Sequence, residues 1–214
     1  MKNRKVFYSF AFAWLFGLAI HAQMPPATAE QQKMMLEKIM AASEKMESLI
    51  CDFEQTKELS VLSEQIISKG KMYYRKNGRL RWEYLSPYSY TFILNDKKIL
   101  LQTETGKNVI DIKSNRFFQE IVKIMINGVD GSGLTDFKNF TNSYYWSDKK
   151  WEVILSPVKK EMKQIFSSIK LTFNVNDFTV ESVVMEERNG DKTNIRLTDK
   201  KLNGKVEDRQ FNID

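Results

Sequence analysis

The side chains best suited to chemistry are scarce in this chain. It has one histidine, His21, and one cysteine, Cys51. Ser-His-Asp and Cys-His nucleophilic sites, and zinc sites built on imidazole, all require histidine. A single cysteine also cannot form a disulfide within the chain. We therefore expect a protein that is not an enzyme and that uses no metal and no cofactor.

Three weaker patterns do not change this expectation. The three places where lysine follows glycine have no second glycine five positions earlier, so no phosphate-binding loop is predicted. Gly131-Ser132-Gly133 resembles a nucleophile elbow in composition, but it lacks the strand-turn-helix context and a histidine partner. The alternating carboxylates Asp52, Glu54 and Glu58 are typical of a solvated strand face.

The N-terminus has the layout of a secretory signal peptide. Lys2, Arg4 and Lys5 precede an apolar run of 15 residues, Val6–Ile20, which is shorter than the roughly 20 residues of a membrane span. We expect cleavage after Ala22, which also removes His21, and a mature chain that is one domain, residues 23–214. No cysteine follows the cut, so we expect a soluble, lipid-free protein in an exported compartment, the periplasm.

Charge excludes one class of partner. The chain carries 33 basic and 27 acidic residues, and three of the basic ones lie in the signal peptide. The remaining 30 basic residues face 27 acidic ones, a net charge of +3. This balance is too mild for nucleic-acid binding.

Helical periodicity occurs twice. Thr28 and Gln31 form a capping-box pair before a run with apolar residues at helical spacing, which predicts a helix over about residues 29–49 after an exposed leader, Met24–Ala27. A second helix is predicted to end at Asn127-Gly128, before the glycine-rich stretch 128–133. The apolar face of this helix contains Phe117, Phe118, Ile121, Val122, Met125 and Ile126.

The rest of the chain alternates with a period of two. From Cys51, large apolar residues recur at every second position and turn residues separate the runs, which predicts half-buried antiparallel strands in a meander that curls into a barrel or part of one. Strands are predicted again over 151–155, 165–175, 180–187, 193–198 and 209–213. The predicted fold class is mainly β, with two helices added.

The stretch Gly70–Pro87, GKMYYRKNGRLRWEYLSP, resembles the LolA family of periplasmic carriers of outer-membrane lipoproteins. Phe53 and Gln55 match an earlier Phe-x-Gln strand of that family, and Leu155-Ser156-Pro157 matches a later strand end. The resemblance implies an incomplete, curved antiparallel β-barrel with an α-helical lid, formed by the first and the mid-chain helix, over a hydrophobic cavity. It also implies the partners: acylated lipoproteins, an inner-membrane ABC-type lipoprotein-releasing complex and an outer-membrane acceptor. We expect a monomer.

Strand parity and the resemblance together nominate the functional residues. The expected cavity face contains Met72, Tyr74, Leu80, Trp82, Tyr84, Phe92 and Leu94; the expected lid contains Phe117, Phe118, Ile121, Val122 and Met125. In the family a basic residue contacts the lid, and Lys76 takes that position here, although Asn77 stands where the family has proline. Arg75 has the opposite parity, so we expect it to point to solvent.

Other interpretations stay open at this point. A stripe of large inward residues more often fills a core than leaves room for a ligand. A protein of the same fold could also act as a periplasmic sensor that binds misplaced lipoproteins without carrying them. A third interpretation is that the protein carries another amphiphilic lipid.

Overall fold

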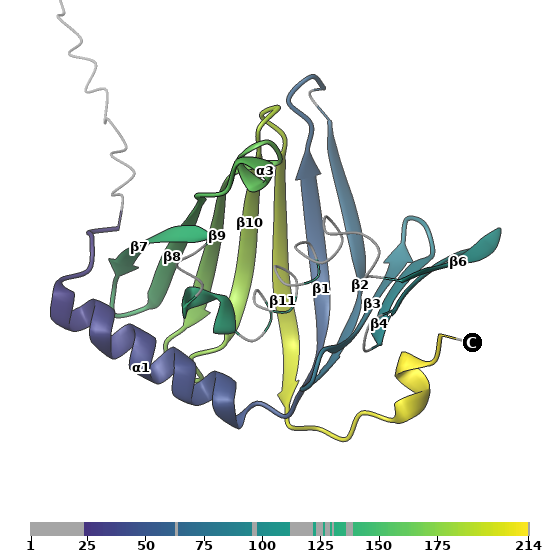
Figure 1. The fold of residues 1–214 in the computed structure, drawn as a ribbon, viewed down its shortest axis with the longest axis horizontal. Helices are drawn as coiled ribbons and strands as arrows, with labels where there is room; N and C mark the ends of the chain where they lie inside the picture. The colour runs from purple at the N-terminus through teal and green to yellow at the C-terminus, as the bar shows by residue number, and fades with distance from the viewer. Residues whose placement is uncertain are drawn as a thin grey trace, which may run out of the picture.

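The computed structural model describes residues 24–62, 64–95, 98–111, 122, 126, 129, 131–135 and 139–213. Its centre is one antiparallel sheet of eleven strands in the order β6-β5-β4-β3-β2-β1-β11-β10-β9-β8-β7 (Figure 1). The strands are β1 Ser48–Glu58, β2 Gln65–Arg75, β3 Arg79–Ser86, β4 Tyr90–Asn95, β5 Lys98–Thr103, β6 Gly106–Asp111, β7 Phe140–Trp146, β8 Lys150–Pro157, β9 Phe166–Asn174, β10 Val180–Glu187 and β11 Lys192–Leu202.

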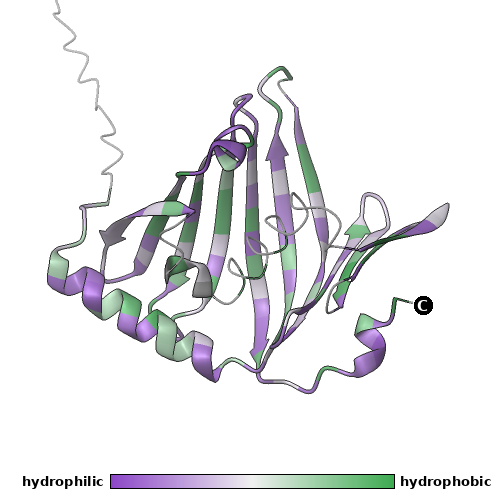
Figure 2. Ribbon diagram, viewed as in Figure 1, coloured by the Kyte–Doolittle hydropathy of each residue, from purple (hydrophilic) through white to green (hydrophobic). Residues whose placement is uncertain are grey.

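The sheet is open and curved, which confirms the predicted fold class. β6 and β7 are its two edges, and all other strands that are consecutive in the chain pair with each other. β1 and β11 join the first six strands to the last five, with Phe53 opposite Leu197. Hydrophilic and hydrophobic residues alternate along the strands (Figure 2), as expected for a sheet with two different faces.

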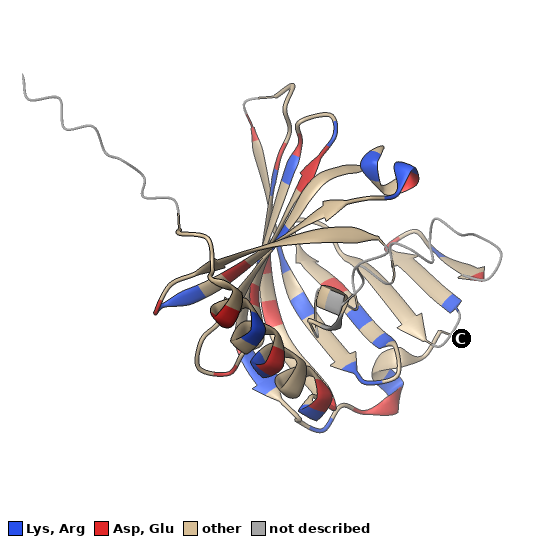
Figure 3. Ribbon diagram, turned by 60° about the vertical axis from the view of Figure 1, so that its left-hand side comes forward, with Lys and Arg blue, Asp and Glu red and all other residues tan. Residues whose placement is uncertain are grey.

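Helix α1, Ala29–Lys45, lies across the inner face of the sheet on the β7–β10 side (Figure 1). The predicted capping box is present: the Thr28 amide donates to Gln31 Oε1 at 2.8 Å, and the Gln31 amide donates to Thr28 Oγ1 at 3.2 Å. Met35 and Ile39 are fully buried against β8 and β9, while Lys and Glu alternate along the outer side of the helix (Figure 3). Burying such side chains stabilises the helix by about 1.5–3 kcal/mol each.

The helix ends four residues earlier than predicted, because β1 begins at Ser48. The leader also differs from the prediction of an exposed segment. The Ala27 amide donates to Tyr144 O at 2.8 Å, and the Trp146 amide donates to Pro25 O at 3.2 Å. The leader therefore covers part of the β7 edge, and Ala27 is buried.

Three short helices have bounds within the described residues: η2 Ser132–Thr135, α3 Lys160–Lys163 and η3 Asp208–Phe211. The predicted strand over 209–213 is wrong, because this segment forms η3 and packs on the outer face of the sheet. Phe211 is fully buried there against Ile93 and Leu100. Within the described residues, no helix is long and apolar enough to cross a membrane.

Candidate ligand-binding site

The seven predicted cavity residues lie together on the inner face of β2, β3 and β4. Tyr84 and Phe92 are half-buried, and the other five are buried in one hydrophobic cluster. The register explains this: Met72 pairs with Trp82 and Trp82 with Phe92, so these three side chains form one row across the sheet. Tyr74, Leu80 and Leu94 form the next row in the same way. That this face binds a ligand stays a prediction.

The inner-face cluster also contains residues that were not predicted from the sequence. β1 adds Leu49, Cys51 and Phe53. β11 adds Ile195 and Leu197, which lie next to β1 although more than 130 residues separate the two strands in sequence. The alternation of Leu49, Cys51 and Phe53 is a signal that could have identified the β1 residues. No local pattern could have identified the β11 residues, because their contribution depends on a non-local strand pairing.

Gly70 lets the aromatic rings of this face approach one another. It pairs with Phe53 on one side and Tyr84 on the other. A Cβ atom at Gly70 would lie 2.6 Å from two ring atoms of Phe53 and 1.9 Å from the carbonyl oxygen of Glu83. The Phe53 ring lies in the space that a side chain at Gly70 would fill. Its centroid is 5.1 Å from that of Tyr84, which it meets edge-on, and 4.6 Å from that of Trp82.

Polar groups enter the same face beside these rings. The Tyr84 hydroxyl donates to Gln55 Oε1 at 2.9 Å. Burial is the main influence on the Tyr84 hydroxyl and raises its pKa to about 12, while the nearby Trp82 and Gln55 side chains act in the opposite direction. The phenol therefore stays protonated at neutral pH and acts as a hydrogen-bonding group rather than a charge.

The inner face is thus graded from one end to the other. At the end near the C-terminus of α1, Leu49, Leu80 and Met72 are fully buried and purely apolar. Toward the opposite end of the same strands, Tyr84 and Tyr90 are half-buried and carry hydroxyls. A ligand with an apolar tail and a polar head matches this gradient in one orientation, with the tail toward the apolar end.

Cys51 lies in the apolar part of the gradient. Its side chain is 1% exposed, and burial raises the pKa of its thiol to about 12. The thiolate is the reactive form of cysteine, so this thiol reacts slowly at neutral pH. Among the described residues, no group of three or more histidines, cysteines and carboxylates is placed to hold a metal ion.

Of the predicted lid residues, Phe117, Phe118, Ile121 and Met125 lie outside the described residues. Val122 is described, as are Ile126 and Val129, and all three are helical. Val129 is buried in the inner-face cluster, and the half-buried Val122 and Ile126 pack against it. These three side chains cover part of the predicted cavity face.

Lys76 contacts the end of α1. Its Nζ donates to Glu44 O at 2.7 Å and to Glu47 Oε1 at 2.8 Å. A cation at this position compensates the unpaired carbonyls at a helix C-terminus. Asn203 supports the same turn, since its Nδ2 donates to Lys45 O and its Oδ1 accepts from the Glu47 amide.

The prediction that Arg75 points to solvent is wrong. Its guanidinium pairs with Asp208 of η3, donates to Val206 O at 3.5 Å and lies 5.1 Å from the centre of the Phe211 ring. Arg75 and Arg79 hold the pKa of the Asp208 carboxyl below its ordinary value. The contact holds the C-terminal segment on the outer face of the sheet.

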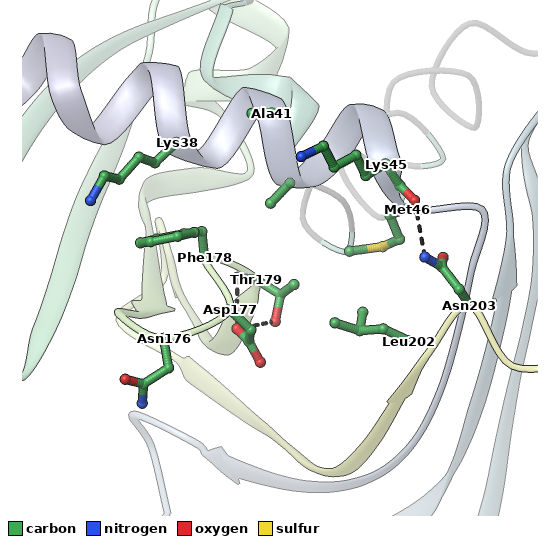
Figure 4. A pocket seen from close by; sticks show the side chains of 11 residues that line it. Lys38, Ala41, Lys45, Met46, Asn176, Asp177, Phe178, Thr179, Leu202 and Asn203 are labelled. Carbon is green, nitrogen blue, oxygen red and sulfur yellow. Dashed lines mark hydrogen bonds between the residues drawn. The ribbon is translucent and has the colours of Figure 1, made fainter.

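A separate cavity of about 330 Å³ lies between α1 and the turn that joins β9 to β10 (Figure 4). Phe178, Leu202 and Met46 form its apolar walls, and Asp177 lies at its edge. The Asp177 carboxylate already accepts from Thr179 and pairs with Lys200 at 3.1 Å. None of the seven predicted cavity residues lines this space.

Comparison with known proteins assigns the family. The model of the family described as outer membrane lipoprotein carrier protein LolA matches residues 44–214. A protein of Chromohalobacter salexigens named outer-membrane lipoprotein carrier protein is 25% identical over 205 residues, which cover 95% of this chain and 93% of that protein.

The solved structure of MucB has a similar fold. MucB superposes with a TM-score of 0.52 at 12% identity, over 88% of this chain and 64% of MucB. The lipoprotein LppX of Mycobacterium tuberculosis superposes with a TM-score of 0.49 at 11% identity, over 87% of this chain and all of LppX, 100%. With four fifths of the chain matched by the family model, the protein belongs to the LolA family of outer membrane lipoprotein carrier proteins.

Proposed function

We propose that this protein is a periplasmic carrier that shields the acyl chains of lipoproteins and moves them from the inner to the outer membrane. The observation that supports this most directly is the graded inner face of β1–β4 and β11, in a member of a lipoprotein-carrier family. The apolar end of that face suits acyl chains, and the end with hydroxyl groups suits the glyceryl head.

The free energies of burial allow an acyl chain to replace the side chains that cover the inner face. A palmitoyl chain of about 14 methylenes gains roughly 11 kcal/mol when it leaves water. Val122, Ile126 and Val129 together gain less than about 9 kcal/mol from their burial, since two of them are half-buried. Acyl chains can therefore replace these side chains on the inner face.

In this proposal the segment that contains Val122, Ile126 and Val129 is the lid, and α1 stays in place. Met35 and Ile39 of α1 are fully buried against the other half of the sheet. Moving α1 would expose both side chains as well as the strands beneath them. This assignment differs from the expectation that the first and the mid-chain helix form the lid together. In this proposal Lys76 acts by holding the end of α1 beside the cavity.

Loading and delivery are partner-dependent steps of the proposal. The sequence has no phosphate-binding loop, and in this proposal an inner-membrane ABC-type complex supplies the energy of loading. An outer-membrane acceptor would then take the lipoprotein. Both partners come to this chain from the family resemblance.

The test begins with a dipalmitoylated lipopeptide and the same peptide without acyl chains. We expect the mature protein to co-elute with the acylated peptide in gel filtration and to leave the unacylated peptide free. The loaded protein is then mixed with outer-membrane vesicles, and transfer of the lipopeptide is followed by sedimentation. Failure to bind the acylated peptide contradicts the proposal, and binding without transfer contradicts the carrier role.

A further inference from the structure

Trp82 carries an unpaired polar group in the middle of the inner face. Its side chain is 7% exposed, and its Nε1 has no hydrogen-bond partner in the part of the chain that the structure describes. A buried donor without a partner loses its hydrogen bonds to water without replacement, which destabilises the folded state. Buried indole N–H groups usually have a partner, so this one points to an acceptor that arrives from outside.

The surroundings of Trp82 restrict what this acceptor can be. Phe53 lies against its ring. The Tyr84 hydroxyl donates to Gln55 and still has lone pairs that can accept, but it does not reach hydrogen-bond geometry with Trp82 Nε1. Below Trp82, the next row of the same face, Tyr74, Leu80 and Leu94, is buried. The N–H group therefore lies between the purely apolar end of the face and the half-buried end with hydroxyls.

We propose that Trp82 Nε1 donates a hydrogen bond to the ester carbonyl of an acylated glyceryl lipid. This inference rests on the proposed function and names the group that the site recognises. An ester accepts hydrogen bonds and donates none, whereas an indole donates one and accepts none, so the two match. The ester is also the group that joins the apolar tail to the polar head, and Trp82 lies where the face changes from apolar to polar.

A phosphate group fits this position poorly. Trp82 lies in a hydrophobic cluster, where an anion would lose its hydration without a cation to replace it. The basic residues of the same strand, Arg79 and Arg81, have the opposite parity to Trp82. Arg81 pairs with Glu83, and Arg79 pairs with Asp208 at 3.2 Å. The neutral ester is therefore the favoured acceptor.

The experiment compares two probes that differ in the carbonyl alone. The first is a lipopeptide with two palmitoyl esters, and the second is the same lipopeptide with two hexadecyl ethers. We expect the mature protein to bind the ester about three- to tenfold more tightly than the ether, the value of one hydrogen bond. Trp82→Phe keeps an aromatic ring without the N–H, so it should remove this preference, even if the smaller ring weakens binding of both probes.

Trp151 provides the matched control. Its Nε1 is also buried without a partner in the described chain, but it lies in the half of the sheet that α1 covers and stacks on Trp146 at 4.9 Å. Trp151→Phe should keep the preference for the ester. In the unsubstituted protein, the indole N–H resonance of Trp82 should move downfield with the ester and stay in place with the ether, while that of Trp151 stays in place with both.

The outcomes separate the two proposals. If neither lipopeptide binds, both the proposed function and this inference are wrong. If both bind equally, or if Trp82→Phe keeps the ester preference, the inference is wrong and the carrier proposal stands. A third probe, dipalmitoyl phosphatidylglycerol, shares the two esters and adds a phosphate. If Trp82→Phe weakens binding of this phospholipid and of the ester lipopeptide equally, the ester contact is supported. If it weakens binding of the phospholipid alone, the ester contact is wrong.

Discussion

Replacement of Gly70 by alanine tests the packing of the inner face most directly. The new Cβ would lie 1.9 Å from Glu83 O, a backbone atom of the neighbouring strand, and 2.6 Å from the Phe53 ring. The ring can rotate away, but the carbonyl belongs to the β3 backbone beside β2. The backbones of β2 and β3 must therefore separate locally to admit one methyl group.

The expected cost follows from this geometry. Added methylenes in a packed interior typically cost about 1–3 kcal/mol, and a clash with backbone rather than with a flexible side chain belongs at the upper end of that range. We expect Gly70→Ala to lower the free energy of unfolding by about 3 kcal/mol. For a protein of this size, that corresponds to a decrease of roughly 6–12 °C in Tm.

Gly106 is the matched control, because it also lies in a strand and a Cβ atom there would meet nothing within 4 Å. Gly106→Ala should leave stability unchanged or raise it by up to about 1 kcal/mol through the unfolded state. Urea unfolding of both variants gives the free energies, and near-ultraviolet circular dichroism reports on the Phe53, Trp82 and Tyr84 rings. A Gly70→Ala variant within 0.5 kcal/mol of the unsubstituted protein, a margin typical of surface changes, would refute the reasoning.

Two further predictions concern the ties at the end of β2. Lys76→Leu should change the free energy of unfolding by less than about 1 kcal/mol. It should also loosen the turn that carries Met46, which is buried with Cys51 in the inner-face cluster, so alkylation of Cys51 should become faster. An unchanged alkylation rate would contradict this role of Lys76. Asp208→Asn should release η3, measured as loss of amide-exchange protection around Phe211. Because Arg75 lowers the folded-state pKa of Asp208, this tie is fully present above the ordinary carboxyl pKa of 3.8 and is lost as pH falls through the lowered value. Protection that does not depend on pH below 3.8 would exclude this role.

Strand parity made the inner face predictable from sequence. Met72, Leu80, Trp82 and Leu94 occupy one face because side chains alternate with a period of two, and one buried face is enough to set the register. The capping box at Thr28 was predictable for a similar reason, since both of its partners lie within one helical turn. Patterns of this kind depend on neighbours in sequence.

Features that depend on distant segments were not predictable. Alternating Phe211 and Ile213 favoured a strand, but this segment forms η3 because its apolar side chains meet the outer face of β4 and β5. The partner of Arg75 lies 133 residues away, so parity predicted its face correctly and its exposure wrongly. The unpaired N–H of Trp82 is likewise a property of the assembled face, and no spacing in the sequence indicates it.

The basic pair Arg75 and Lys76 connects the two faces of the sheet. Being consecutive, they point to opposite sides of the β2 end, where Lys76 holds α1 and Arg75 holds η3. Both contacts are exposed and stabilise the fold little, whereas the burial of Ile39 and Phe211 holds the two segments on the sheet. The pair therefore sets position more than stability. Since the two side chains share no partner, the stability effects of Lys76→Leu and Arg75→Leu should add within about 0.5 kcal/mol. A larger coupling in the double variant would mean that the β2 backbone transmits movement of the C-terminal segment to the end of α1 beside the cavity.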